Sequence, residues 1–264
     1  MPVFKQRTRL LTATRKLTPS RKLTPSRKLQ LKCKGYVLSF DGVDDYVDCG
    51  AVSQATGTST LTVEVMFKLL EKDYHRVVGK YNYAARGEWL LYPEGDGKVN
   101  FYVGDGSSIG VVHSISTYTV NEWEVWYATF DNGVIKLYKN GIFDNQESIA
   151  ITSIPDLGVK LGVGTTPDDP FYRTYGLIAY VRIYNHALSE KEFLHNLRNP
   201  LNPVHKSDLV LWLDPTSVDV ENNVWEDKSG YGNNGVIYGA TPVFGYLYYN
   251  KTLDRLEFVR GVNE

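Results

Sequence analysis

The sequence lacks several features that would assign it quickly to a class. No apolar run approaches the roughly 20 residues of a membrane-spanning helix. The N-terminus is charged and has no apolar core segment, so we expect no Sec-type signal peptide in this chain. Two cysteines, Cys33 and Cys49, allow at most one disulfide, and sequence alone does not bring their Cα atoms within bridging range. Their pairing stays open at this stage.

Acidic residues are absent from residues 1–34, which contain eleven lysines and arginines. The rest of the chain holds 18 basic and 30 acidic residues, a net charge of −12 behind an overall value of −1. Residues 15–29 repeat Arg-Lys-Leu-Thr-Pro-Ser twice and end in Arg-Lys-Leu, and the prolines exclude a regular helix. We therefore expect an extended or disordered basic arm. It is either a solvated linker or an arm that contacts the phosphates of nucleic acid or an anionic surface.

From residue 35 onward the chain alternates short strand-like segments with turns. Leu61, Val63, Val65 and Phe67 repeat with the period of two that is typical of a strand. Turn signals recur every 8–12 residues, including the type I′ dipeptide Asn140-Gly141. Residues 35–264 are long enough for one large domain. The pattern predicts an all-β antiparallel sandwich.

One helix interrupts the strand pattern near residues 189–197. Ser189 and Glu192 have the spacing of a capping box, and Phe193, Leu194 and Leu197 give the segment an apolar face. Prolines at positions 200 and 203 end it.

Several motifs, taken in order, resemble the laminin-G-like members of the concanavalin A-like lectin/glucanase superfamily. They are Phe-Asp-Gly-Val-Asp-Asp-Tyr-Val at 40–47, the strand 61–67, Asn-Glu-Trp and Ala-Thr-Phe-Asp at 121–131, Lys-Leu-Tyr-Lys-Asn-Gly at 136–141, and the stretch 176–189. The resemblance covers about residues 36–197 and implies a concanavalin A-like jelly roll. Because this fold serves lectins, adhesion modules, glycosidases and structural proteins, it implies little about function.

The chain departs from the family pattern in two places. The last strand of the family often reads Ile-Asp-Glu-Val, whereas residues 178–181 read Ile-Ala-Tyr-Val and lack the carboxylates that calcium prefers. Residues 208–243 resemble the segment that usually opens the domain, but here they follow it. Either a second domain begins there or the domain is circularly permuted. We favour completion of the same sandwich, in cis or by exchange with a neighbouring subunit.

Motifs for catalysis are missing. A glucanase of this fold should carry Glu-x-Asp-x-x-Glu on one strand, and no such run occurs. Glu122 and Glu124 alternate, and we expect them on a solvated face. Neither a Gly-x-Ser-x-Gly elbow nor a phosphate-binding Gly-Lys-Ser/Thr loop is present, and the five histidines show no close metal-ligand spacing. We predict that the protein is not an enzyme.

Two kinds of site remain as candidates. Asp41, Asp44 and Asp45 could bind calcium, or they could only stabilise their own turn. Two loops combine flat aromatic rings with hydrogen-bonding groups, as sugar recognition requires, although the rings could equally pack the loops. The candidate ligand-binding residues are Tyr81, Tyr83, Arg86, Asp168, Asp169, Tyr172 and Arg173.

The leading functional hypothesis is a non-catalytic recognition or attachment module that binds a glycan or glycoprotein surface. The alternatives are a self-assembling structural protein of a virion or surface layer, which would use the basic arm and strand exchange, and a degenerate glycosidase. The family resemblance implies an extracellular, surface or virion-associated location.

Overall fold

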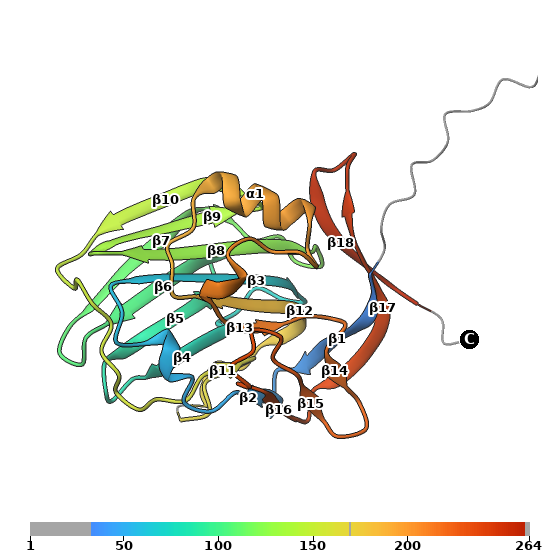
Figure 1. Ribbon diagram of the computed structural model, residues 1–264, viewed down its shortest axis with the longest axis horizontal. Helices are drawn as coiled ribbons and strands as arrows, with labels where there is room; N and C mark the ends of the chain where they lie inside the picture. The colour runs from blue at the N-terminus through green and yellow to red at the C-terminus, as the bar shows by residue number, and fades with distance from the viewer. Residues whose placement is uncertain (1–32, 169, 262–264) are drawn as a thin grey trace, which may run out of the picture. The chain divides into compact units, whose positions relative to one another are not determined.

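Two antiparallel sheets form a β-sandwich in the computed structural model, which describes residues 33–168 and 170–261 (Figure 1). The sandwich predicted from turn spacing is confirmed. The basic arm falls almost entirely on residues 1–32, which lie outside the described residues, while Lys34 belongs to the first strand. Within the described ranges, no helix is both long and apolar enough to cross a membrane.

Sheet A has the strand order β10-β9-β8-β3-β12-β1-β17-β18, with β13 paired to β12. Its strands are β1 (Cys33–Asp41), β3 (Thr60–Leu69), β8 (Glu124–Asp131), β9 (Val134–Lys139), β10 (Ile142–Ser148), β12 (Tyr175–Tyr184), β13 (Leu209–Leu213), β17 (Thr241–Asn250) and β18 (Arg255–Arg260).

Sheet B has the strand order β14-β15-β16-β2-β11-β4-β5-β6-β7. Its strands are β2 (Tyr46–Asp48), β4 (Val78–Asn82), β5 (Gly87–Pro93), β6 (Lys98–Gly104), β7 (Ile109–Thr117), β11 (Gly162–Val163), β14 (Val218–Asp219), β15 (Val224–Trp225) and β16 (Gly235–Tyr238). Two 3-10 turns, η1 (Ser53–Ala55) and η2 (Lys206–Asp208), lie in connecting segments.

The core lies between the two sheets and follows from strand alternation. Val63, Val65 and Phe67 of β3 belong to the same buried cluster as Trp89 and Leu91 of β5. Successive side chains of a strand point to opposite faces, so every second residue of each strand fills this layer. The residues between them form the outer faces of the sandwich.

Helix α1 (Glu190–Arg198) is the α-helix of the described residues and confirms the predicted one within a residue at each end. Ser189 and Glu192 form the predicted capping box. Phe193 and Leu197 are fully buried, and the Phe193 ring lies 4.3 Å from that of Tyr127 on β8. The helix therefore covers the outer face of sheet A (Figure 1).

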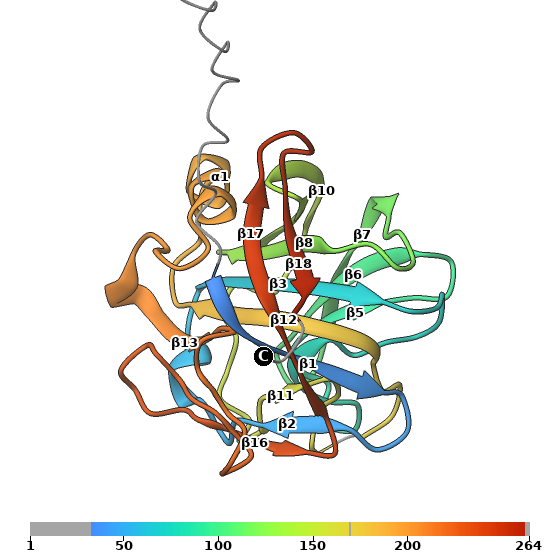
Figure 2. The ribbon, with the colours of Figure 1, turned by 90° about the vertical axis from the view of Figure 1, so that its right-hand side faces the viewer.

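The C-terminal segment pairs with strands that precede it by up to about 200 residues in the chain. Strand β17 runs antiparallel to β1, β16 pairs with β2, and β13 pairs with the part of β12 that β1 leaves free (Figure 2). These ladders form within one chain. That residues 208–243 stand in for the strands that usually open the domain stays a prediction.

The two cysteines are free thiols and both are buried. Burial, with a smaller contribution from the carboxylate of Asp214, raises the pKa of Cys33 to about 11. Burial raises the pKa of Cys49 further, again with carboxylates nearby. The open question of pairing is thus answered for the folded chain: Cys33 and Cys49 form no disulfide.

Candidate functional site

A cluster of tyrosines lies on the outer face of sheet B. Tyr81, Tyr92 and Tyr102 project from β4, β5 and β6, opposite to the core residues of the same strands. Tyr74 and Tyr172 join them from the preceding and following loops, with ring centroids 5.9 Å and 6.0 Å from Tyr92. We call these residues the tyrosine cluster. Strand alternation explains its three inner members, because Tyr92 follows the core residue of β5 by one position.

A buried arginine connects the two loops that the sequence singled out. The Arg76 guanidinium lies over the ring of Tyr81 at 5.4 Å and over that of Tyr172 at 5.6 Å. Its Nη1 donates to Thr166 Oγ1 at 3.1 Å, and its backbone N–H donates to the carbonyl of Tyr172 at 2.8 Å. A guanidinium over aromatic faces is attracted by the ring quadrupole, more strongly when water is excluded. Arg76 therefore fixes Tyr172 relative to β4.

Two members of the tyrosine cluster face solvent. Tyr74 is 46% exposed and Tyr172 is 53% exposed, whereas Tyr81 and Tyr92 are 5% and 7% exposed. The rings of Tyr74 and Tyr172 are 5.4 Å apart and tilted by 45°. Rings held by buried neighbours present apolar area with little conformational freedom left to lose on binding. The geometry therefore offers a fixed aromatic platform at the surface.

Tyr92 and Tyr102 of the cluster stay protonated near neutral pH. Burial, reinforced by the Glu94 carboxylate, raises the pKa of Tyr102 to about 12. The same two causes raise the pKa of Tyr92 further. Neutral phenols both donate and accept hydrogen bonds, as do the hydroxyl groups of a sugar.

Tyr172 adopts a left-handed backbone conformation with φ +55°. A residue with a Cβ atom pays roughly 1–2 kcal/mol for this region, which glycine enters freely. Such strain is often found at functional positions. The contacts with Arg76 hold Tyr172 in this conformation despite the strain.

The other predicted binding residues are not members of the tyrosine cluster. Tyr83 is 75% exposed. Arg86 donates from Nη1 to the carbonyl of Ser107 at 2.9 Å. Asp168 accepts from the Lys160 N–H at 2.6 Å, and its carbonyl accepts from Asn82 Nδ2 at 3.3 Å. Asp169 lies outside the described residues.

Asp41, Asp44 and Asp45 converge, with one carboxylate oxygen of each within 4.8 Å of the others. Asp41 Oδ1 accepts from the N–H groups of Val43 and Asp44, and Asp45 Oδ2 accepts from the N–H of Asp41. The carboxylates of Asp41 and Asp45 thus accept hydrogen bonds from backbone N–H groups of their own turn. Burial, with a smaller contribution from the other two carboxylates, raises the pKa of Asp45. Calcium binding here stays a prediction.

The acidic turn and the predicted loop that contains Asp168, Tyr172 and Arg173 lie at the same end of strands β1 and β12. Asp41 on β1 pairs with Tyr175 on β12. The charge of Arg173 lowers the pKa of Asp45, against the larger effect of burial. Arg173 is therefore within electrostatic reach of the acidic turn, which the sequence treated as a separate site.

The prediction that Glu122 and Glu124 share a solvated face is wrong for Glu124. Glu124 is 4% exposed and forms an ion pair with Lys139 at 2.8 Å. It also accepts hydrogen bonds from Trp126 Nε1 at 3.0 Å and from the N–H of Thr119 at 3.0 Å. Buried charges are retained where such partners satisfy them. Glu122 does lie at the surface, in an ion pair with Arg255.

Sequence reasoning missed Tyr74, Arg76, Tyr92 and Tyr102. The signal for the last two was present, because Tyr92 and Tyr102 each stand next to a core residue of the same strand, Leu91 and Phe101. Tyr74 and Arg76 stand in a loop without periodicity, so no local pattern marks them. Sequence reasoning also missed that His186 and His205 approach each other, with ring centroids 5.0 Å apart.

The strand order and the two-layer core define an antiparallel β-sandwich of the lectin type. The sequence model of the concanavalin A-like lectin/glucanases superfamily matches residues 41–193, more than half of the chain. The chain therefore belongs to this superfamily, and the resemblance found in the sequence is confirmed. A search of curated proteins gives no match.

Solved structures show the same fold. A protein of Bacteroides ovatus ATCC 8483, provisionally assigned to carbohydrate binding, superposes with a TM-score of 0.62 at 19% identity over 81% of this chain. The alignment spans 60% of the length of that protein. The CBM40 module of the Ruminococcus gnavus IT-sialidase, solved with α2,3-sialyllactose, gives a TM-score of 0.51 at 17% identity, over 62% of this chain and 96% of the module.

Proposed function

We propose that the protein is a non-catalytic carbohydrate-binding module that holds a saccharide on the tyrosine cluster. The observation that carries the proposal is the pair of exposed rings, Tyr74 and Tyr172, fixed from behind by Arg76 and Tyr92. The C–H faces of a pyranose pack against such rings, and its hydroxyl groups require neighbouring polar groups. The guanidinium of Arg173, next to Tyr172 in the sequence, and the phenol groups of the cluster would supply such polar groups.

Membership of a superfamily that includes lectins supports this proposal. The two solved structures of the same fold are described as carbohydrate-binding, one of them with a sialylated sugar bound. Their sequence identities of 19% and 17% speak for the fold alone, so the ligand class rests on the exposed rings.

A glycan array followed by calorimetric titration tests the proposal. We expect binding of at least one saccharide class by the wild-type chain, and an affinity loss of about tenfold or more in Tyr172→Ala and in Tyr74→Ala. Tyr231→Ala is the matched control, because Tyr231 is 50% exposed and stands outside the cluster. Unchanged affinity in both cluster variants, or no saccharide bound at all, would overturn the proposal.

The same titration in EDTA and in calcium tests the acidic turn. If calcium supports binding, Asp44→Asn should weaken the saccharide affinity in calcium and leave it unchanged in EDTA. Asp44 is the most suitable position because it is exposed and its carboxylate accepts none of the turn's hydrogen bonds described above. Equal affinities with and without calcium would exclude a role for calcium in saccharide binding.

The two alternatives from the sequence stay predictions. Self-assembly of a virion or surface layer drew on the basic arm, of which residues 1–32 lie outside the described residues. Mass measurements over a range of concentrations test it, and a stable monomer throughout would count against it. A hydrolysis screen against β-glucans tests the degenerate glycosidase, and turnover there would contradict the non-catalytic proposal.

A further inference from the structure

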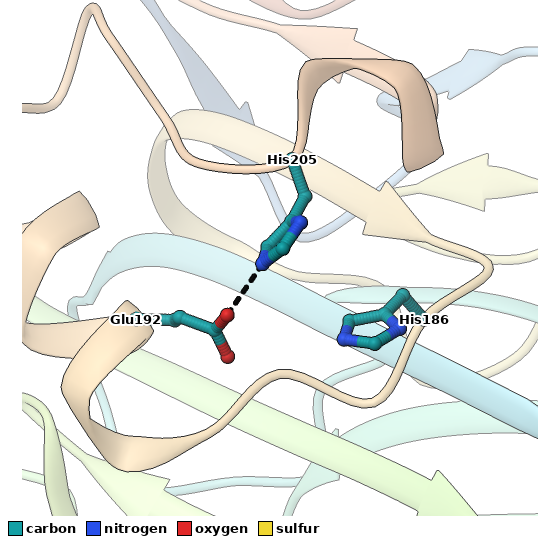
Figure 3. Close-up of side chains that lie close together, drawn as sticks. All are labelled: His186, Glu192 and His205. Carbon is teal, nitrogen blue, oxygen red and sulfur yellow. Dashed lines mark hydrogen bonds and ion pairs between the residues drawn. The ribbon is translucent and has the colours of Figure 1, made fainter.

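Two histidines and one glutamate converge beside the start of helix α1, away from the tyrosine cluster (Figure 3). His186 follows β12, Glu192 stands in the first turn of α1, and His205 precedes η2. One ligand atom of each, a ring nitrogen or a carboxylate oxygen, lies within 4.8 Å of the other two. We call these three residues the His-Glu-His triad.

The backbone that carries the two histidines is tied to its surroundings. The carbonyl of His186 accepts from Thr62 Oγ1 on β3 at 2.6 Å. The N–H of Asn185 donates to the carbonyl of Asp208 at 3.0 Å, and the N–H of Asp208 donates to the carbonyl of His205 at 2.9 Å. The two segments are thus held side by side by bonds that do not involve the imidazole rings. The approach of the rings follows from this arrangement.

The Glu192 carboxylate is oriented by the helix cap. Its Oε2 accepts from the N–H of Ser189 at 2.6 Å and from Ser189 Oγ at 2.7 Å. Its Oε1 faces Nε2 of His205, with which it forms a hydrogen bond. The capping box therefore occupies one oxygen and leaves the other directed at the histidines (Figure 3).

His205 has a second carboxylate on its other side. Its Nδ1 lies 3.7 Å from Asp208 Oδ2, while its Nε2 points into the triad. Histidines that bind metal commonly donate the remaining ring N–H to a carboxylate, which fixes the tautomer and the ring orientation. Asp208 stands on the correct side of His205 for this role, at an ion-pair distance rather than a hydrogen-bond distance, and this is an observation independent of the triad itself.

We propose that His186, Glu192 and His205 bind a divalent transition-metal ion of the zinc type. Two imidazole nitrogens and one carboxylate oxygen suit zinc, whereas calcium and magnesium prefer all-oxygen surroundings. Ligands of a tetrahedral zinc ion lie about 3.3–3.5 Å apart, given metal–ligand bonds of about 2.0–2.1 Å. The ion would replace the hydrogen bond between Glu192 and His205, and a fourth position would remain for water.

The bound ion would hold helix α1 against the outer face of sheet A. Its ligands come from the end of β12, from α1 and from the segment before η2, so one ion would join the side chains of three segments, in addition to the backbone hydrogen bond between Asn185 and Asp208. This function is independent of saccharide binding, because the triad and the tyrosine cluster share no residue.

Thermal unfolding and calorimetry with zinc chloride test the proposal on the full chain. We expect one zinc ion bound per chain and a rise in Tm of about 5–10 °C at a zinc concentration 100-fold above Kd. Magnesium and calcium at the same concentration should give no such rise. His186→Gln should lower the zinc affinity by more than about 100-fold, and Asp208→Asn by about tenfold or more.

His186→Gln separates metal binding from folding. The His186 ring is exposed, and its described contact is with the ring of His205, so the variant should keep the metal-free Tm of the wild type. His113→Gln is the matched control, an exposed histidine on β7. Residues 1–32 contain no histidine, cysteine, aspartate or glutamate and offer no competing side-chain ligands of these kinds. Zinc affinity that is unchanged in His186→Gln, or that is weaker than about millimolar in the wild type, would overturn the proposal.

Discussion

The outer faces of the two sheets both carry tyrosines, but they expose them differently. On sheet A, Tyr127 and Tyr180 are fully buried, beneath a cover that includes helix α1. On sheet B, the tyrosine cluster ends in Tyr74 and Tyr172, which are 46% and 53% exposed. Both faces also hold a buried arginine, Arg182 or Arg76, packed against aromatic rings.

The buried charges of the two faces have different partners. On sheet A, Arg182 forms an ion pair with Glu64 at 2.8 Å, and both side chains are fully buried. Glu64 also accepts from Tyr180 OH at 3.0 Å and from Asn196 of helix α1 at 2.8 Å. On sheet B, Arg76 lies against Tyr172, which reaches the surface. The polar network of sheet A therefore connects the sheet to helix α1, whereas Arg76 on sheet B supports the exposed ring of Tyr172.

The difference shows that tyrosine content alone does not mark a binding face in this protein. The chain has 19 tyrosines, and four of them are buried in the cluster that also contains Phe193 and Leu197 of helix α1. What separates the two faces is exposure together with support from behind. Four predictions test this separation.

The largest effect is expected where the sheet A network is broken. Arg182→Met leaves the Glu64 carboxylate buried without its cation, so we expect a loss of about 3–5 kcal/mol in the free energy of unfolding. Denaturation in guanidinium measures it. The double variant Glu64→Gln/Arg182→Met should recover part of the loss because no unpaired charge remains. Lys160→Met is the control, since its ion pair with Asp48 is half exposed and should contribute less than about 1 kcal/mol.

A smaller effect is expected at the strained position of sheet B. Tyr172→Gly should be more stable than Tyr172→Ala by about 1 kcal/mol, because glycine adopts a φ of +55° without strain. Both variants lose the ring, so their difference isolates the backbone. At Tyr74, which is not among the residues with positive φ, the order should reverse by about 0.4–1 kcal/mol. The same order at both positions would contradict the strain argument.

His75 should make the support of the tyrosine cluster sensitive to acid. Burial lowers its pKa below the usual 6.5. The backbone carbonyls of Glu71 and Arg173, each 3.4 Å from a ring nitrogen, and the carboxylates of Asp73 and Glu71 oppose this shift because they favour the charged ring. The unfolded chain therefore binds a proton near pH 6.5 that the folded chain binds only at lower pH, so stability falls as the pH drops below 6.5. We expect at most about 1 kcal/mol lost between pH 6.5 and 5.5.

The measurement is the difference in unfolding free energy between the wild type and His75→Gln at pH 7.5, 6.5 and 5.5. His113→Gln serves as the control, because His113 is exposed on β7. A difference that stays constant with pH would contradict the assignment to His75.

The last prediction concerns the reaction rates of the two thiols and involves no change in stability. Cys33 begins β1 and belongs to the buried cluster that includes Phe193 and Leu197 of helix α1. Cys49 belongs to the core between the sheets. Because burial raises both pKa values, a disulfide reagent at pH 8 should react slowly with the native chain and rapidly in guanidinium. We expect Cys33 to react before Cys49, as the single variants Cys33→Ser and Cys49→Ser would show. Equal native rates would mean that the cover and the core open together.

The sequence determined the parts of this protein that depend on local pattern. The period of two in Leu61 to Phe67 placed β3, and Ser189 with Glu192 placed helix α1, because alternation and capping involve residues a few positions apart. The motifs at residues 40–47 and 136–141 identified the superfamily for the same reason.

Only the tertiary structure decided which distant residues meet. Arg76 contacts Thr166 across 90 positions, and His186 approaches His205 because bonds to Thr62 and Asp208 align their segments. Glu124 is buried because Lys139 and Trp126 surround it, although its alternation with Glu122 suggested a surface position. Strand register and loop docking bring these groups together, and both depend on packing across the whole sandwich rather than on neighbouring residues.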